Sequence, residues 1–258
     1  TGLSQTEMAK KIGVQFATIN RWENGHSQPT RLAGEGLFAL CEDFNVPVYN
    51  MIIEKVKREV SSLKIEDGRV VLYHGSKSGL VGDIAPISRE KCDFVKGFYM
   101  GTTPEQPLTL ICDFEESKFY IVSIDASELS TAEIPADIDW AMIVAYHRGR
   151  MERIKGSKFY NKYSTMTSGK DLAIGNIAND RMYRVMKSFF EKEITDVALL
   201  HSLSALDLGR QYVAITEKAC KQIKILSEKI LSPLELGILK ERSIVRREEG
   251  IALTENIL

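Results

Sequence analysis

The chain has 258 residues, of which 44% are hydrophobic and 27% are charged, and its formal net charge at pH 7 is −1. This length can hold one large domain or two smaller ones, and the apolar content excludes wholesale disorder. No apolar run approaches the roughly 18 residues of a membrane span, and no charged-then-apolar leader opens the sequence. We therefore expect a cytoplasmic protein that makes no contact with a membrane.

The cysteines lie far apart in the sequence, without a CxxC pair or a neighbouring pair of histidines. In a cytosolic protein this spacing predicts reduced core residues, not zinc ligands or disulfides, and we expect no bound metal. The four are Cys41, Cys92, Cys112 and Cys220.

The first residues predict two short helices that meet across one glycine. Ser4 followed three residues later by Glu7 is typical of a capping box, so a helix should begin at Gln5 and end at Gly13. A second helix is predicted from about residue 15 to 23 and is closed by Asn24-Gly25. Its inward side is predicted to hold Ala17, Ile19 and Trp22. Two helices in this arrangement form a helix-turn-helix, whose second helix enters a major groove.

The residues "LSQ", "MAKKIGV" and "TINRWENG", followed by Pro29, resemble the phage-repressor and xenobiotic-response-element family of helix-turn-helix regulators. The resemblance implies DNA binding, with base-edge contacts from Gln15, Phe16, Asn20 and Arg21. It also implies contacts with phosphates at Gln5 and Asn24. The alternative is a helix pair that only packs or that binds another protein.

The resemblance is incomplete at its start, because the family has a helix before "LSQ" and this sequence starts at Thr1. We therefore expect either a fragment or an incomplete module over residues 1–46. Helical periodicity continues over 34–41 and 46–63, which predicts a closing helix and then a linker helix within 47–67.

After Asp67-Gly68 the sequence changes to short strands and turns. Strands are predicted at 70–74, 118–125, 211–215 and 222–226 from their β-branched and aromatic content. Helices are predicted over 135–151 and 178–194, the second with Asn179 or Asp180 as its cap. The mixture indicates an α+β fold, with the second domain over 68–228. Neither GxGxxG nor GxxxxGK[ST] is present.

Five segments in order are similar to the ADP-ribosyltransferase fold. They are "LYHGS", "GFYMGTT", Asp139-Trp140 ahead of Arg148, "DLAIGNIANDRMY" and "RQYVAITEKACKQIKIL". The likeness extends from Val70 to about Leu226. It is greatest to a bacterial family that was first catalogued as a domain of unknown function and is often associated with toxin–antitoxin loci.

The resemblance implies that NAD is the substrate. Transfer of ADP-ribose breaks the bond between nicotinamide and ribose through an oxocarbenium-like transition state, as in glycoside hydrolysis. His74 is implied to bind ribose hydroxyls, the Gly75 backbone to hold the carboxamide, and Tyr99 to stack on the nicotinamide ring. Ser76, Gly97 and Phe98 are implied to complete the NAD-binding residues. Taken alone, His74 is better read as a strand-end histidine bonded to a backbone carbonyl; NAD binding is implied only by His74 together with Gly75, Tyr99 and Gln211 in order.

Gln211 occupies the position where transferases of this type that modify proteins usually carry glutamate. With His74 and Tyr99 it completes the predicted catalytic set. An amide can accept a hydrogen bond from a ribose hydroxyl, but it cannot supply negative charge or act as a base. The carboxylates nearest in the sequence are Asp207 and Glu217, and neither is predicted to replace it; Glu217 is expected to be a surface cap.

The remaining features have ordinary interpretations. His26, His147 and His201 are predicted to be ordinary surface or core residues. Segment 175–181 is predicted to cap a helix. The alternative for this segment is a loop near the NAD phosphates or the acceptor, with Arg181 as the cation. Ser232-Pro233 predicts the start of a C-terminal helix within 229–258. That helix could dock on its own domain, on a second copy in a homodimer, or on an antitoxin-like partner.

The sequence thus predicts a helix-turn-helix module joined to an NAD-dependent ADP-ribosyltransferase whose acceptor is left open. The module would regulate its own locus or bring the enzyme to nucleic acid. The first alternative is a DNA-binding regulator whose transferase-like domain is inactive and only binds NAD or a partner. The second is an NAD hydrolase.

Overall fold

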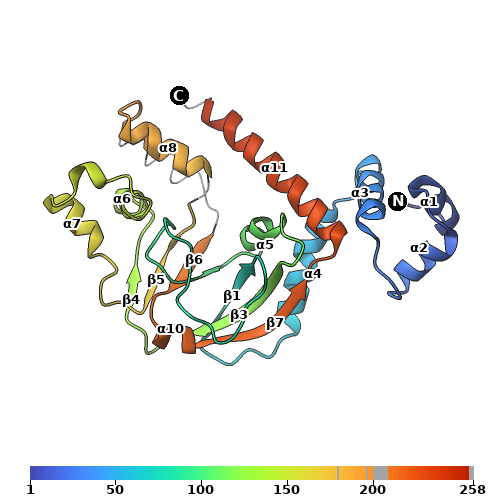
Figure 1. The fold of residues 1–258 in the computed structure, drawn as a ribbon, viewed down its shortest axis with the longest axis horizontal. Helices are drawn as coiled ribbons and strands as arrows, with labels where there is room; N and C mark the ends of the chain where they lie inside the picture. Colours follow the sequence, from blue (N-terminus) through green and yellow to red (C-terminus); the bar gives the residue numbers. More distant parts are fainter. Residues whose placement is uncertain (179, 196, 200–208, 256–258) are drawn as a thin grey trace.

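The chain forms a group of N-terminal helices followed by a mixed seven-stranded sheet with helices packed around it (Figure 1). The structure is a computed structural model and describes residues 1–178, 180–195, 197–199 and 209–255. The predicted α+β class is confirmed.

Three helices make up the N-terminal group: α1 (Gln5–Ile12), α2 (Phe16–Glu23) and α3 (Arg31–Asp43). The predicted capping box is present: the Glu7 amide donates to Ser4 Oγ at 3.3 Å and the Ser4 amide donates to Glu7 Oε2 at 2.8 Å. Gly13 ends α1 with φ of +80°, a left-handed conformation that glycine adopts without a steric penalty. Local sequence signals therefore set both ends of α1.

One prediction about α2 is wrong. Ile19 is buried and Trp22 half-buried, as predicted, but Ala17 is exposed. At 3.6 residues per turn, position 17 lies about 200° around the helix from position 19. Ala17 therefore points away from the apolar stripe that Ile19 and Trp22 share.

The helix after this group, α4 (Val48–Ser62), packs into the core of the sheet region together with the C-terminal helix α11 (Pro233–Glu255). Ile52 and Val56 of α4 share a buried cluster with Phe119 and Leu239. α11 extends from α3 past α4 to α8, so this long helix contacts both parts of the chain (Figure 1). Of the docking alternatives for the C-terminal helix, the structure shows packing on its own chain.

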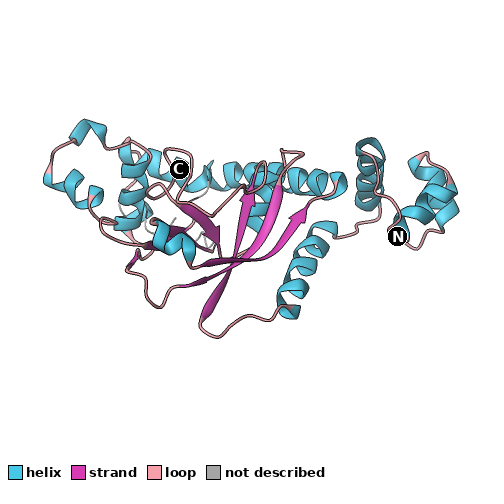
Figure 2. Cartoon of the chain, turned by 60° about the horizontal axis from the view of Figure 1, so that its bottom comes forward, coloured by secondary structure: helices cyan, strands magenta, loops and turns pink. Residues whose placement is uncertain are grey.

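The seven strands lie in the order β4-β5-β6-β2-β1-β3-β7, and all neighbours are antiparallel except β4 and β5 (Figure 2). The four predicted strands are present: the strand at 118–125 has the predicted ends, those at 70–74 and 211–215 differ by one or two residues, and that at 222–226 extends to Ile230. The strands are β1 (Arg69–Ser76), β2 (Phe98–Gly101), β3 (Lys118–Asp125), β4 (Thr131–Glu133), β5 (Leu172–Asn176), β6 (Arg210–Ala214) and β7 (Ile223–Ile230).

Helices cover one face of this sheet in two groups. α5 (Glu105–Ile111) packs with α4 and α11 against β1 and β3, whereas α6 (Ile138–His147), α7 (Lys158–Ser164) and α8 (Asp180–Phe190) form a cluster with side chains of β5 and β6. The short helices η1 (Glu152–Ile154) and α10 (Glu217–Lys221) complete the described elements. The opposite face of the sheet packs on α10 and on Leu80 and Ile84 of the loop after β1.

The two predicted central helices are present but shorter than predicted. α6 begins after Asp137, whose side chain accepts hydrogen bonds from the amides of Asp139 and Trp140 at 2.9 and 3.2 Å. Asp180 is the first residue of α8, and Asn179 lies outside the described residues. Side chains of both helices, among them Ile143 of α6 and Val185 of α8, belong to one buried cluster with Ala173 of β5 and Val213 of β6.

The cysteines carry free thiols, and two of the four are core residues as predicted. Cys112 and Cys220 are buried, while Cys41 and Cys92 are half-buried. Over the described parts of the chain, no helix is long and apolar enough to cross a membrane.

Candidate functional site

The three strands that carry the predicted catalytic residues are neighbours in the middle of the sheet. β2 lies between β6 and β1, and Gly101 of β2 pairs with Gln211 on one side and with Tyr73 on the other. Adjacent strands are about 4.8 Å apart. The fold therefore brings together segments 70–76, 97–101 and 210–214, which are well separated in the sequence.

β1 and β2 are joined at the Tyr73–Gly101 pair, whereas β1 and β3 pair along their whole length. Next to this pair, the His74 ring of β1 contacts β2 through both a hydrogen bond and a ring stack. Its Nδ1–H donates to the backbone carbonyl of Tyr99 at 2.7 Å, and the ring stacks on Phe98 with centroids 4.2 Å apart. The backbone-bonded role that the sequence allowed for His74 is thus present.

This hydrogen bond fixes the tautomer of His74. Because Nδ1 carries the proton, Nε2 has the lone pair and can accept a hydrogen bond from a hydroxyl. Burial lowers the pKa of His74, and the bond to Tyr99 opposes that shift. Desolvation therefore favours the neutral ring with a hydrogen-bond acceptor at Nε2.

The phenol of Tyr99 is tied to the loop that precedes β2. Its hydroxyl accepts from the amide of Phe94 at 3.1 Å and donates to the carbonyl of Val95 at 2.9 Å. Burial raises the pKa of Tyr99 far above its ordinary value, so the phenol stays protonated. The ring packs beside the α6–α8 cluster, on the face of the sheet that Gln211 shares. The ring of His74, which stacks on Phe98, lies on the opposite face.

Two predicted glycines have close packing partners. A Cβ on Gly75 would be 2.7 Å from both the Pro107 carbonyl oxygen and Ile111 of α5. A Cβ on Gly97 would be 2.6 Å from the Ala214 carbonyl oxygen. Both positions therefore require glycine for packing alone. The remaining predicted residue, Ser76, uses its hydroxyl to donate to the Gly79 carbonyl at 2.8 Å.

Gln211 belongs to a buried polar cluster that sequence reasoning missed. Its Nε2 donates to Asp93 Oδ2 at 3.1 Å and to the carbonyl of Asn176 at 2.9 Å. Asp93 also accepts from the Ala178 amide at 3.1 Å and forms an ion pair with Arg148, whose Nε lies 3.0 Å from Oδ1. Only 7% of Asp93 and 5% of Gln211 is exposed, so the cluster is shielded from water.

The carboxylate beside Gln211 is therefore neither of those nearest in the sequence. Glu217 is exposed at the start of α10, but the predicted capping role is wrong: the cap is Thr216, whose hydroxyl accepts from the Ala219 amide at 3.2 Å. Asp207 lies outside the described residues. The signal for Asp93 was weak: it is a single carboxylate five residues before Phe98, in "CDFVKGF". Its 118-residue separation from Gln211 hides the contact from any local pattern.

His147, at the end of α6, is half-buried. Its Nε2 is buried and has no hydrogen-bond partner among the described residues. Burial lowers the pKa of His147 to about 4, and the charge of Asp93 acts weakly in the other direction. His147 is thus neutral at physiological pH. His26 is exposed as predicted, and His201 and the side chain of Arg181 lie outside what the structure describes.

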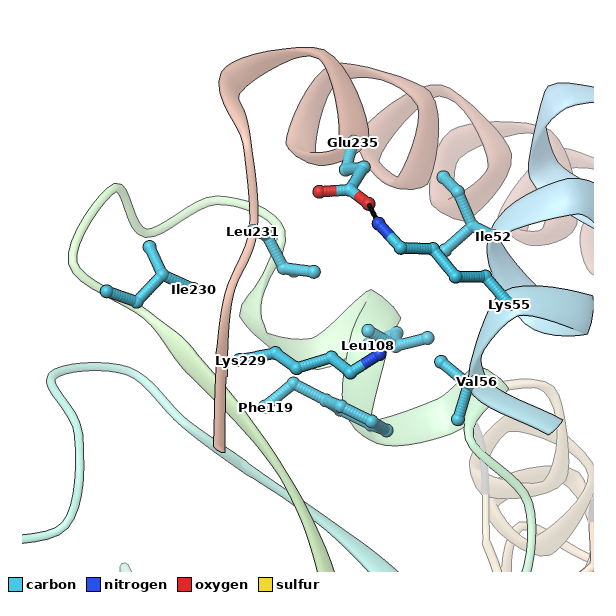
Figure 3. Close-up of a pocket in the computed structure, with 9 residues that line it drawn as sticks. All are labelled: Ile52, Lys55, Val56, Leu108, Phe119, Lys229, Ile230, Leu231 and Glu235. Carbon is cyan, nitrogen blue, oxygen red and sulfur yellow. Dashed lines mark hydrogen bonds and ion pairs between the residues drawn. The ribbon is translucent and has the colours of Figure 1, made fainter. Parts of the chain in front are cut away.

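A cavity of about 240 Å³ lies elsewhere, between the linker helix α4, α5, and the junction of β7 with α11 (Figure 3). Its lining contains the Lys55–Glu235 ion pair, with Nζ and Oε1 3.1 Å apart, and Lys229, which pairs with Glu59. None of the predicted site residues lines it. Its lining residues are Ile52, Lys55, Val56, Leu108, Phe119, Lys229, Ile230, Leu231 and Glu235.

The predicted DNA-contacting residues lie mostly on the outer surface of α2 and its ends. Those exposed are Gln15, Phe16, Asn20, Arg21 and Asn24, with Phe16 52% exposed. Gln5 is half-buried and connects α1 to α2: its Nε2 donates to Glu23, and its Oε1 accepts from Asn20 Nδ2 at 3.4 Å. The Asn24 side chain donates to the Asn20 carbonyl at 2.8 Å and so caps α2.

The fold and these surfaces define an α+β protein with an N-terminal helix-turn-helix module. Residues 1–48 match a family model described as helix-turn-helix. Residues 70–225, more than half of the chain, match the family described as protein of unknown function (DUF3990), and the chain belongs to that family. No curated protein and no solved structure matches it.

Proposed function

We propose that the sheet domain is an NAD-dependent ADP-ribosyltransferase and that the helix-turn-helix module directs it to DNA or regulates its own locus. The observation that carries the proposal is the pairing of Gly101 with both Tyr73 and Gln211. This pairing places the strand ends bearing His74, Tyr99 and Gln211 next to one another. The resemblance of these three segments to the transferase motifs supplies the chemistry.

In the proposed reaction the bond between the nicotinamide nitrogen and ribose C1′ breaks, and its electron pair leaves with nicotinamide. The acceptor then forms a bond to C1′ and releases a proton. Gln211 Oε1 would accept a hydrogen bond from a ribose hydroxyl. Nε2 of His74, whose ring lies on the opposite face of the sheet, would reach the same ribose where β1 and β2 are no longer paired beyond Tyr73 and Gly101. The positively charged transition state makes such oriented acceptors stabilising.

A second function is favoured by the chemistry of Gln211. Its side chain is neutral, and both of its amide hydrogens are bonded within the protein. A neutral hydrogen-bond acceptor such as Gln211 Oε1 would be enough for a transferase-like domain that binds NAD without turning it over. The chain would then act as a DNA-binding regulator that responds to NAD or to a partner.

The test is incubation of the purified protein with NAD labelled in the adenine moiety, with protein extract, RNA or DNA supplied in turn. Nicotinamide release and transfer of label are measured for the wild type, His74→Ala and His26→Ala. His26 is an exposed loop residue of the N-terminal module and provides the matched control. We expect release that is lost in His74→Ala and kept in His26→Ala.

The labelled fraction identifies the acceptor class, and release without labelling indicates NAD hydrolysis. NAD binding without release under any condition would contradict the transferase and favour the regulator. A failure of both binding and release would contradict any role of NAD.

A further inference from the structure

The orientation of the Gln211 amide is fixed by its two partners. Asp93 Oδ2 and the Asn176 carbonyl are both acceptors, so the NH₂ group must face them at 3.1 and 2.9 Å. An amide is planar, and its oxygen lies on the side opposite these bonds. Oε1 receives no hydrogen bond from the described residues and has its full capacity to accept.

Asp93 is itself held in place by three other donor groups. Arg148 binds Oδ1 through Nε and Nη2, and the Ala178 amide donates to Oδ2. The guanidinium balances the charge of a carboxylate that is nearly inaccessible to water. A carboxylate that accepts from an amide N–H also polarises that amide, which makes its oxygen a stronger acceptor.

This environment explains why residue 211 is glutamine. A glutamate there would place a carboxylate against Asp93 Oδ2 and the Asn176 carbonyl, and two carboxylates in one buried site repel each other. The buried carboxylate of Asp93 therefore favours an amide side chain at position 211 of β6. The negative charge is on Asp93, and the acceptor that has no partner among the described residues is Gln211 Oε1.

We propose that Asp93 is a positioning residue that orients Gln211 Oε1 toward the ribose of NAD. Asp93 and Gln211 together would then replace the glutamate that transferases of this type usually carry at position 211. The proposal rests on the function proposed above. Asp93 acts through Gln211 and does not itself contact the substrate. Nε2 of Gln211 hydrogen-bonds Asp93 and the Asn176 carbonyl, and Oε1 would accept a hydrogen bond from the ribose.

The test exchanges the two functional groups. Nicotinamide release is measured for the wild type, Asp93→Asn, Gln211→Glu and the double variant Asp93→Asn/Gln211→Glu. Each single change should lower kcat by about tenfold or more, with a much smaller effect on KM, because the bond it disorients strengthens in the transition state. The double variant should have a kcat several-fold above either single variant, since an amide and a carboxylate again face each other. Recovery should be incomplete, because the Asn176 carbonyl then faces a carboxylate oxygen.

Asp171→Asn is the matched control. Asp171 accepts from Ser130, Thr216 and Lys218, and it lies beyond the end of β5 that is farthest from Gln211. We expect it to lower stability without changing kcat. Unchanged kcat in Asp93→Asn, or a double variant no better than the single ones, would overturn the proposal.

A readout that does not need activity is the side-chain amide of Gln211 in protein labelled with ¹⁵N-glutamine. Its NH₂ signals should be absent in Gln211→Glu, protected from exchange in the wild type, and shifted in Asp93→Asn. An amide that exchanges as fast as an exposed glutamine overturns the geometry. If the amide is protected but the wild type never releases nicotinamide, the proposed function has failed, and the catalytic role of Asp93 fails with it.

Discussion

Gly97 lies so close to the backbone of Ala214 that a Cβ would be 2.6 Å from the Ala214 carbonyl oxygen and 2.7 Å from Val213 Cγ1. The backbone oxygen cannot move without shifting β6. Gly97→Ala should therefore separate β2 from β6 and lower the free energy of unfolding by about 1–3 kcal/mol. Urea denaturation followed by circular dichroism measures this change.

Gly101→Ala, at the other end of β2 from Gly97, is the control for that variant. The nearest atom to a Cβ on Gly101 is 3.5 Å away, which is an ordinary van der Waals distance. We expect a loss well below that of Gly97→Ala. Equal effects of the two variants would show that contact with β6 is not the cause.

The Asp93–Arg148 pair predicts a large stability effect from removal of one partner. Arg148→Met keeps much of the side-chain length but leaves the Asp93 carboxylate without its counter-ion in a buried cluster. Breaking a buried pair in this way costs about 3–5 kcal/mol. Lys162→Met removes the partner of Asp139 at a much more exposed position and should cost about 0–1 kcal/mol. Similar unfolding midpoints for the two variants would contradict the prediction.

Stability should decline as the pH falls from about 7 to about 4, because two histidines are held neutral by burial. Burial lowers the pKa of His74, and it lowers that of His147 from 6.5 to about 4. Below pH 6.5 the unfolded chain binds protons at these positions that the folded chain does not, so acid favours unfolding. Below about pH 4, His147 is also protonated in the folded state, and its contribution to the slope disappears.

Thermal unfolding at pH 7, 6 and 5 measures this decline. His147→Gln removes one of the two groups and should flatten the dependence, while His26→Ala, in an exposed loop, should leave it unchanged. A melting temperature that is constant from pH 7 to pH 5 would exclude a role for either buried histidine.

Arg21 is the side chain best suited to test the DNA-binding surface. Asn20 hydrogen-bonds both Gln5 and Asn24, so its removal would also disturb the module, whereas Arg21 is exposed on α2. A sequence selected by the wild type from random duplex DNA provides the ligand. Arg21→Ala should weaken binding to it by about 1–3 kcal/mol, the cost of one lost bidentate base contact.

Fluorescence anisotropy at fixed salt concentration gives the affinities. Lys57→Ala is the control, because Lys57 lies on α4 and pairs with Glu54. Equal binding by the wild type and Arg21→Ala would place the DNA contacts elsewhere. A sequence-independent loss with a smaller salt dependence would indicate a phosphate contact in place of a base contact.

The sequence by itself determined the features that depend on neighbours in the chain. The Ser4–Glu7 box and Gly13 set the ends of α1, and the β-branched and aromatic run at 118–125 set β3. The order of the motifs that contain His74, Tyr99 and Gln211 was also readable, and His74 and Gln211 lay on predicted strands, whereas the strand that carries Tyr99 was not predicted. Such signals act within a few residues, so they survive without knowledge of the fold.

Only the tertiary structure decided which groups surround those residues. Asp93 and Gln211 meet across 118 positions of sequence, and Arg148 reaches the same carboxylate from the end of α6. No periodicity encodes these contacts, because they depend on the antiparallel order of β6, β2 and β1 and on where α6 ends beside them. The sequence shows that residue 211 is glutamine. The fold shows why: the side chain faces the buried carboxylate of Asp93, which an amide can hydrogen-bond and a second carboxylate would repel.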